Sequence, residues 1–128
     1  MYENLKNKTV LYIEDDQFIR EQTSSLLEVV FQKVFTAQNG EEGLTLYNEN
    51  SNNIDAIVTD INMPILTGIQ MCQELRSCSN FNTPIIGVSA YSDDDNMLND
   101  SKDLFTLYLR KPIEIKDLIN SIEEVIIG

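Results

Sequence analysis

Acidic side chains directly follow two separate apolar runs of the chain. Three acids at residues 14–16 follow the run at residues 9–13, and Asp60 follows the run at residues 56–59. In a parallel α/β sheet the carboxyl ends of such strands lie side by side, so these carboxylates would crowd into one pocket. Crowded carboxylates raise one another's pKa and cost stability unless a cation offsets their charge. The spacing therefore predicts a cation site.

Other polar residues follow the later apolar runs. Ser89 follows the run at residues 85–88, and Lys111 comes shortly after the run at residues 107–109. Taken singly, each has an ordinary explanation: Asp16 suits a helix cap, Ser89 a strand end, and Lys111 a solvated surface charge. Their occurrence at the same ends of successive strands predicts instead that acids, a hydroxyl and a lysine share one edge of a sheet.

The segments that must position these side chains alternate between short apolar runs and helical patterns. Strand-like runs occur at residues 9–13, 34–37, 56–59, 85–88 and 107–109. Between them, apolar residues recur at helical spacing, as at Ile19, Leu26 and Leu27, and each helix would cover one face of the sheet. Strict alternation of strands and helices predicts a parallel sheet with helices on both faces and right-handed crossovers.

Helix starts are also signalled locally. Asn39, Thr67 and Ser92 each stand before a helical pattern, with an acid or amide three residues further on. The side-chain oxygen of such a residue accepts hydrogen bonds from the first free amides of a helix. Cys72 and Cys78 are six residues apart, which fits neither a disulfide framework nor a paired metal motif, so we expect idle thiols.

Composition limits the classes of function. A chain of 128 residues predicts one domain, residues 1–128, with a core from about residue 8 to residue 127. With 21 acidic and nine basic residues, the net charge of −12 argues against binding to nucleic acid or to anionic membrane. No apolar run is long enough to span a membrane, so a cytoplasmic location is expected. The chain has no histidine, which removes the usual general base and any histidine phosphotransfer role.

Four motifs in order along the chain carry a family resemblance. They read Leu-Tyr-Ile-Glu-Asp-Asp at residues 11–16, Val-Thr-Asp-Ile-Asn-Met-Pro at 58–64 followed by Thr67 and Gly68, Val-Ser-Ala at 88–90, and Arg-Lys-Pro at 110–112. Through these motifs the whole chain resembles the receiver domain of bacterial two-component response regulators. The resemblance implies a flavodoxin-like (βα)5 three-layer sandwich whose five parallel strands follow the order 2-1-3-4-5.

The resemblance also implies a role for each acid. Asp60 would be the phosphoacceptor, whose carboxylate attacks phosphorus to form an acyl phosphate. The cofactor would be Mg²⁺, held by Asp15, by Asp60 and by the backbone carbonyl of Asn62, with Glu14 bound through a water. Asp16 falls one place beyond the family's acidic pair and would be a peripheral acid or a helix cap.

Lys111 and Ser89 would complete the phosphoryl site. Phosphoryl transfer has a loose transition state with charge spread over the equatorial oxygens, so catalysis depends on positioned charges and hydrogen-bond donors. By resemblance, the Lys111 ammonium would contact one phosphoryl oxygen and the Ser89 hydroxyl another. The peptide between Lys111 and Pro112 would be cis and would aim the lysine inward.

Two further pairs of residues would control the switch and its lifetime. After phosphorylation, Ser89 would move toward the phosphoryl group and Tyr108 would turn into the vacated space. At the positions that influence water access in the family, Asn62 could orient a hydrolytic water and Tyr91 could shield the acyl phosphate. Both expectations rest on the resemblance.

The implied function is a phosphorylation-activated signalling switch, without small-molecule turnover as its main role. The phosphoryl group would come from a histidine kinase or phosphotransfer protein. The fourth helix, the fifth strand and the fifth helix would form the face that controls an unknown downstream protein or output domain. The domain itself would bind neither nucleic acid nor membrane, and we expect a monomer or weak homodimer.

The chain departs from the family pattern before the fifth strand. Residues 104–107 read Leu-Phe-Thr-Leu, where a small turn is common. This apolar bulk is either part of the core or a docking surface. Gly87 in the fourth strand is also unusual and is interpreted as a point of close backbone approach.

Two alternatives from other classes remain. A haloacid-dehalogenase-like phosphohydrolase also uses a strand-end aspartate and Mg²⁺, but that family places a second aspartate two residues later, where this chain has Asn62. A flavodoxin-like cofactor carrier needs a phosphate-binding loop after the first strand. The three acids at residues 14–16 would repel that phosphate.

Overall fold

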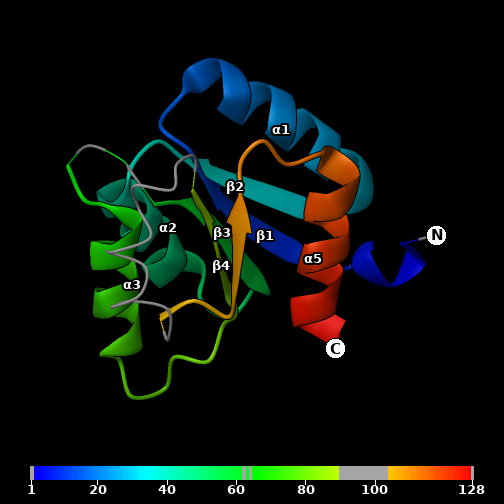
Figure 1. The fold of residues 1–128 in the computed structure, drawn as a ribbon. Coiled ribbons are helices and arrows are strands. Elements are labelled where there is room, and N and C mark those ends of the chain that lie inside the picture. Colours follow the sequence, from blue (N-terminus) through cyan, green and yellow to red (C-terminus); the bar gives the residue numbers. More distant parts are fainter. Residues whose placement is uncertain (1, 62, 64, 90–103, 128) are drawn as a thin grey trace.

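The structure, a computed structural model, describes residues 2–61, 63, 65–89 and 104–127. Its strands are β1 (Thr9–Ile13), β2 (Lys33–Ala37), β3 (Ala56–Asp60), β4 (Ile85–Ser89) and β5 (Leu107–Arg110). All neighbouring strands pair in parallel, in the order β2-β1-β3-β4-β5 (Figure 1). The flavodoxin-like α/β architecture and the strand order predicted above are therefore confirmed.

Burial explains why the central strands read as continuous apolar runs. Every residue of β1, β3 and β4 is buried, whereas the edge strands β2 and β5 are partly exposed. A parallel strand that is covered on both faces must be apolar on both. Three strands end one residue later than predicted, so Asp60, Ser89 and Arg110 are the last residues of their strands and not the first residues of the turns that follow.

Helices cover both faces of the sheet. In the described part of the chain these are α1 (Gln17–Val30), α2 (Gly40–Asn50), α3 (Gly68–Arg76) and α5 (Ile115–Ile127), and a 3-10 turn, η1 (Glu3–Leu5), precedes β1. Figure 1 shows α1 and α5 on one side of the sheet and α2 and α3 on the other. The helix expected after Ser92 lies outside the described residues. None of the described helices has the length and apolar character needed to cross a membrane.

Each face of the sheet has its own core. On the side of α2 and α3 the fully buried residues include Leu11, Ile57, Met71, Cys72 and Ile85. On the side of α1 and α5 they include Leu5, Val10, Leu27, Val58 and Ile122. Leu5 belongs to η1, so the packed core begins before residue 8. Both cysteines are free thiols, Cys72 buried and Cys78 exposed.

Helix α1 covers the sheet with fewer apolar side chains than its periodicity predicted. Ser24 and Leu27 are its buried residues, while Ile19 and Leu26 are 41% and 50% exposed. The expectation that Ile19 and Leu26 pack against the sheet is therefore wrong. The reason is a cavity of about 620 Å³ between α1 and α5, which both side chains line.

Three of the helix starts use the predicted cap residues. Asp16 accepts a hydrogen bond from the Ile19 amide, and Asn39 caps α2 in the same way. Thr67 forms a complete capping box with Gln70 at the start of α3. These caps satisfy amides that the first helical turn leaves free, so they fix where each chain segment turns from strand to helix.

The segment before β5 is part of the core. Phe105 is 8% exposed, and its ring lies against Gly87 of β4, where an added Cβ would be 2.7 Å from the ring. The core interpretation of residues 104–107 therefore holds for Phe105. The interpretation of Gly87 needs a correction, because a side chain and not another backbone makes the close approach.

Candidate functional site

The acids predicted to meet do meet. Strands β1 and β3 are neighbours, and Ile13 is opposite Thr59. The residues that follow these two, Glu14 and Asp60, therefore reach the same edge of the sheet. Glu14, Asp15 and Asp60 each offer a carboxylate oxygen, and these three atoms lie within 4.8 Å of one another. Glu14 and Asp60 are buried and Asp15 is exposed. The cluster is thus partly buried and open to solvent on the side of Asp15.

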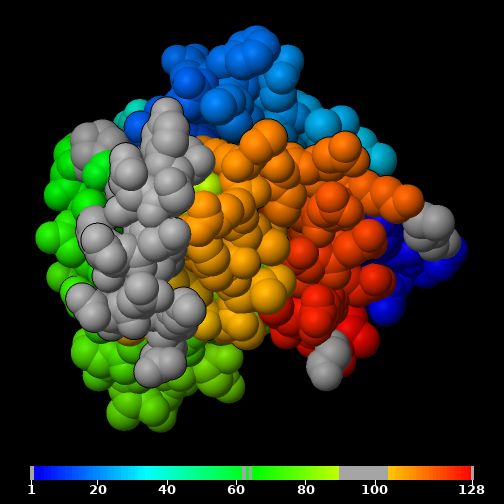
Figure 2. Space-filling view, in the orientation of Figure 1, coloured from blue at the N-terminus to red at the C-terminus, as the bar shows by residue number. Residues whose placement is uncertain are grey.

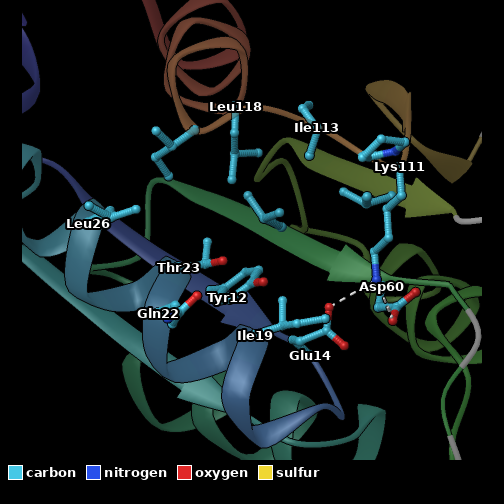
Figure 3. A pocket seen from close by; sticks show the side chains of 14 residues that line it. Tyr12, Glu14, Ile19, Gln22, Thr23, Leu26, Asp60, Lys111, Ile113 and Leu118 are labelled. Atoms are coloured by element: carbon cyan, nitrogen blue, oxygen red, sulfur yellow. Dashed lines mark hydrogen bonds and ion pairs between the residues drawn. The ribbon is translucent and has the colours of Figure 1, made fainter.

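Lys111 joins two of these carboxylates. Its Nζ lies 3.0 Å from Glu14 Oε1 and 3.2 Å from Asp60 Oδ2 (Figure 3). The lysine follows β5, and its amide donates to the carbonyl of Ser89 over 2.7 Å, which extends the β4–β5 pairing up to the site. The peptide bond between Lys111 and Pro112 is cis, as the family resemblance implied.

The turn after β1 holds Glu14 from several sides. The Glu14 amide donates to the carbonyl of Ala37 over 3.0 Å, and Glu14 Oε2 accepts from the Asp16 amide over 3.1 Å. The side chain of Asp16 points instead to the Ile19 amide, so Asp16 is a helix cap here. Arg20 also contacts this turn: its Nη1 donates to the carbonyls of Glu14, at 2.8 Å, and Asp15, at 3.4 Å.

Arg20 was missed by sequence reasoning. The available signal was its place in the second turn of the helix that begins directly after the acids. From that place a long side chain can fold back to the turn. A contact from a guanidinium to backbone carbonyls depends on main-chain geometry, however, and leaves no pairing of residue types to find in the sequence.

Gly68 brings the start of α3 against the main chain of Asp60. The Gly68 amide donates to the carbonyl of Ile61 over 3.0 Å. A Cβ at Gly68 would lie 2.5 Å from the carbonyl oxygen of Asp60, much closer than any van der Waals contact. Glycine is therefore required at residue 68 for this approach, which fixes the backbone that carries Asp60.

The site has more buried negative charge than Lys111 can balance. Burial raises the pKa of Glu14 to about 7 and also raises the pKa of Asp60, although Lys111 opposes both shifts. Burial lowers the pKa of Lys111, but Asp60 and Glu14 outweigh that effect and the net shift is upward. Two buried carboxylates and a third that is exposed, all oxygen donors, fit a hard divalent cation such as Mg²⁺. Asn62, whose carbonyl was expected to be a ligand, lies outside the described residues.

Ser89 lies on the strand next to Asp60, and Tyr108 lies one strand further away. Val88 is opposite Asp60, so Ser89, which is buried, lies one residue beyond the acid on the adjacent strand. Tyr108 is opposite Gly87 on β5. Its hydroxyl is buried and has no hydrogen-bond partner in the described part of the chain. Tyr91 lies outside the described residues.

A cavity leads from this cluster between α1 and α5. It has a volume of about 620 Å³, with Glu14, Asp60 and Lys111 at one end (Figure 3). Its walls are mostly apolar and include Ile19 and Leu26 of α1 and Ile113 and Leu118 near α5. The charged cluster of Glu14, Asp60 and Lys111 therefore lies next to an apolar surface.

A parallel α/β sheet with an acid cluster and a lysine at its carboxyl edge defines a phosphoacceptor domain of the flavodoxin-like class. The chain belongs to the response regulator receiver domain family, whose sequence model matches residues 10–123. It is therefore a phosphorylation-activated switch of the two-component type. Receiver domains of this family generally bind Mg²⁺ and work with histidine kinases and output domains.

Individual relatives agree with this assignment. A "probable transcriptional regulator ycf27" of Porphyridium aerugineum is 31% identical over 122 residues, which cover 95% of this chain and 49% of that protein. Among solved structures, a response regulator receiver domain protein of Clostridium thermocellum has 32% identity and a TM-score of 0.83, covering 93% of this chain and 94% of that one. The receiver domain of Francisella response regulator 1452 has 35% identity and a TM-score of 0.79, covering 93% and 96%. The chain spans about half of the first curated relative and 21% of an Arabidopsis thaliana two-component response regulator.

Proposed function

We propose that Asp60 is the phosphoacceptor and that Glu14, Asp15, Lys111 and Ser89 assist the transfer. A carboxylate oxygen of Asp60 forms a bond to phosphorus, and the bond from phosphorus to the leaving atom of the donor breaks. The observation that carries this proposal is the position of Lys111 Nζ, 3.0 Å from Glu14 and 3.2 Å from Asp60. The lysine charge lies where negative charge builds up on a phosphoryl group attached to Asp60.

The acids around Asp60 suit a bound Mg²⁺. Asp15, Asp60 and the carbonyl of Asn62 would be its direct protein ligands, and Glu14 would act through a water. When bound, Mg²⁺ neutralises charge on the phosphoryl oxygens and on the carboxylates. Support comes from the three carboxylate oxygens within 4.8 Å of one another. Glu14 accepts a hydrogen bond from Lys111, which fits an indirect role for Glu14 through a water.

The phosphoryl donor is proposed to be a histidine kinase or a phosphotransfer protein. Residues 1–128 contain no histidine, so the phosphohistidine must lie outside them. We propose that the donor contacts α1, which begins directly after the acids. Two apolar side chains of α1 face solvent, Phe18 at 67% exposure at the end of the helix next to the acids and Val29 at 82% near its far end. Large exposed apolar side chains favour a protein partner on this face.

The response to phosphorylation is proposed to pass through Ser89 and Tyr108. Ser89 donates its hydroxyl to the phosphoryl group, and Tyr108 then changes its rotamer. The Tyr108 hydroxyl is buried and has no hydrogen-bond partner in the described residues. Burial of an unsatisfied hydroxyl costs free energy, so it lowers the cost of leaving this rotamer and supports the proposal. Strand β5 and helix α5 form one continuous surface (Figure 2). We propose that a downstream protein or output domain binds this surface together with the helix expected after Ser92, which lies outside the described residues.

The remaining expectations stay proposals on the same basis. Asn62 and Tyr91 are proposed to set the lifetime of the acyl phosphate. We also propose that residues 1–128 form one receiver domain, a monomer or weak homodimer in the cytoplasm, without small-molecule turnover as its main role. The family assignment leaves the phosphohydrolase and cofactor-carrier alternatives without support.

Acetyl phosphate provides a direct test of the acceptor. Wild type and Asp60→Asn are incubated with acetyl phosphate, with and without Mg²⁺, and the covalent adduct is measured by mass spectrometry of the intact protein. We expect a base-labile phosphoryl adduct that requires both Asp60 and Mg²⁺. The substitution is nearly isosteric, so loss of the adduct reports chemistry and not unfolding.

Asp55→Asn is the matched control. Asp55 is an aspartate next to β3 at the opposite end of the strand, where its carboxylate accepts from the Thr9 amide over 2.8 Å. This variant should be phosphorylated like wild type. An adduct that persists in Asp60→Asn, or that does not depend on Mg²⁺, would reject the proposed function.

A further inference from the structure

One guanidinium spans the peptide that joins the two acids after β1. Arg20 Nη1 lies 2.8 Å from the carbonyl oxygen of Glu14 and 3.4 Å from that of Asp15. Arg20 is itself fixed in α1, since its amide donates to the carbonyl of Asp16 over 2.9 Å. The arginine is partly buried. The two carbonyls are therefore tied to the helix that follows them.

Separate contacts hold the beginning, the middle and the end of the turn after β1. The Glu14 amide is held by Ala37 of β2, which fixes where the turn begins. The Asp16 carboxylate caps the Ile19 amide, which fixes where the helix starts. The peptide between Glu14 and Asp15 lies between these two anchors, and Arg20 bonds its carbonyl and the next one. Changes in the backbone dihedral angles of Glu14 and Asp15 would redirect their side chains relative to each other.

Both side chains must keep their present directions for the site to work. Glu14 reaches inward to Lys111, at 3.0 Å, while Asp15 stays exposed with an oxygen within 4.8 Å of one on Asp60. Loss of a residue that orients metal ligands without touching the metal typically lowers metal affinity by roughly 10–100-fold. Both contacts come from the single nitrogen Nη1, which carries two N–H donors and can therefore serve two carbonyl oxygens.

We propose that Arg20 is a positioning residue for the cation site, which holds the Glu14–Asp15 peptide so that both carboxylates converge with Asp60. The inference rests on the proposed function, because it assumes that this cluster binds Mg²⁺. Arg20 itself contacts neither the phosphoryl group nor the cation. It acts through the main chain of the two acids.

The direction in which Mg²⁺ affinity changes when Arg20 is replaced distinguishes a positioning role from a purely electrostatic effect of its charge. A guanidinium near a cation site repels Mg²⁺, so removing its charge alone would strengthen Mg²⁺ binding. Loss of positioning has the opposite effect, because the carboxylates no longer converge. Arg20→Met removes the donors and the charge but keeps a long side chain with good helix propensity. We expect its Mg²⁺ affinity to fall roughly 10-fold.

The experiment titrates each protein with Mg²⁺ alone and follows backbone amide shifts by NMR. Arg20→Lys keeps the charge and one donor group, so its affinity should lie between those of wild type and Arg20→Met. Arg76→Met is the matched control. Arg76 also binds a backbone carbonyl, that of Leu104, through Nε at 3.0 Å and Nη2 at 2.9 Å, but it lies at the far end of α3 from Asp60. Its loss should leave Mg²⁺ affinity unchanged.

A second readout uses acetyl phosphate phosphorylation at varied Mg²⁺. In Arg20→Met the half-saturating Mg²⁺ concentration should rise by a similar factor, while the rate at saturating Mg²⁺ stays close to that of wild type. Equal or tighter Mg²⁺ binding in Arg20→Met, with wild type and Arg76→Met binding normally, would overturn the inference alone. If Arg20→Met does not fold, Arg20→Lys decides: unchanged affinity there overturns the inference. No Mg²⁺ binding by wild type would overturn both the inference and the proposed function.

Discussion

Phe105 fills the space that a side chain at Gly87 would need. A Cβ on Gly87 would lie 2.7 Å from Cδ1 and 2.8 Å from Cε1 of the Phe105 ring. The backbone on both sides of the ring is anchored: Arg76 binds the carbonyl of Leu104, and the Thr106 amide donates to the carbonyl of Ile85 over 2.7 Å. The ring therefore cannot move aside easily, and the two residues depend on each other.

This dependence predicts a non-additive pair of substitutions. Gly87→Ala should lower the free energy of unfolding by about 1–3 kcal/mol, because it overpacks the core. Phe105→Ala should cost about 3–5 kcal/mol, because it leaves a cavity. In the double variant the new methyl group occupies part of that cavity. The double variant should thus lose at least 1 kcal/mol less, roughly, than the sum of the single losses, measured by urea unfolding.

Phe81 provides the control for this cycle. Its ring packs edge-on against Tyr47 at 5.3 Å and is not among the atoms nearest to Gly87. Gly87→Ala combined with Phe81→Ala should be additive within error. An additive result for the Phe105 pair as well would contradict the packing described here.

The sequence could predict the acid cluster because topology alone brings it together. Parallel strands place their carboxyl ends at one edge, so Asp60 and the acids after β1 had to meet once the alternation of elements was recognised. The contacts that hold them could not be predicted in this way. Arg20 binds backbone carbonyls, and Phe105 fills a gap left by a missing side chain, and neither contact requires a recognisable pairing of residue types.

Helix α1 illustrates the limit of periodicity. Ile19, Leu26 and Leu27 all fit a helical apolar stripe, yet Ile19 and Leu26 remain 41% and 50% exposed. Periodicity states which residues share a helix face, but it does not state how closely the neighbouring helix packs. Here a cavity lies between part of α1 and part of α5, so part of the stripe faces that space.

Replacement of Lys111 should lower the free energy of unfolding, because the buried acids lose their compensating charge. Lys111→Met leaves Glu14 and Asp60 without the ammonium that contacts both of them. Breaking a buried ion pair leaves an uncompensated charge, so we expect a loss of about 2–3 kcal/mol at pH 7.5 without Mg²⁺. Saturating Mg²⁺ should reduce this loss, because the cation takes over part of the compensation.

Urea unfolding with and without Mg²⁺ measures this effect. Lys116→Met, at an exposed position in the first turn of α5, is the matched control and should stay within about 0.5 kcal/mol of wild type. If Lys111→Met were as stable as wild type without Mg²⁺, the lysine would not be compensating the two acids in the folded protein.

The raised pKa of Glu14 predicts a pH dependence of stability. Burial raises the Glu14 pKa in the folded protein to about 7, above its ordinary value of 4.5. Between these values the folded form binds a proton that the unfolded chain releases, so Glu14 stabilises the fold at low pH and this contribution is lost as pH rises toward 7. Asp60, whose pKa is also raised, acts in the same direction.

Unfolding measurements between pH 5 and pH 8 without divalent cations test this sign. The free energy of unfolding of Glu14→Gln should fall less across this range than that of wild type, because a glutamine does not titrate. Glu49→Gln, an exposed glutamate on α2, should keep the wild-type slope. A wild-type slope in Glu14→Gln would show that Glu14 titrates near its ordinary pKa.

Gly68 and Gly40 allow backbone position to be separated from general strain. A Cβ at Gly68 would lie 2.5 Å from the carbonyl oxygen of Asp60, and a Cβ at Gly40 would lie 2.5 Å from that of Leu66. Alanine at either position should therefore cost a similar 1–3 kcal/mol or so of stability.

Only Gly68→Ala displaces the residue that accepts the phosphoryl group, and small displacements of reacting groups slow reactions strongly. Its rate of phosphorylation by acetyl phosphate at saturating Mg²⁺, per folded molecule, should fall at least tenfold or so, while Gly40→Ala stays near wild type. Equal slowing in the two variants would mean that the rate follows general strain, and the close contact of α3 with Asp60 would then have no specific role in holding the acceptor.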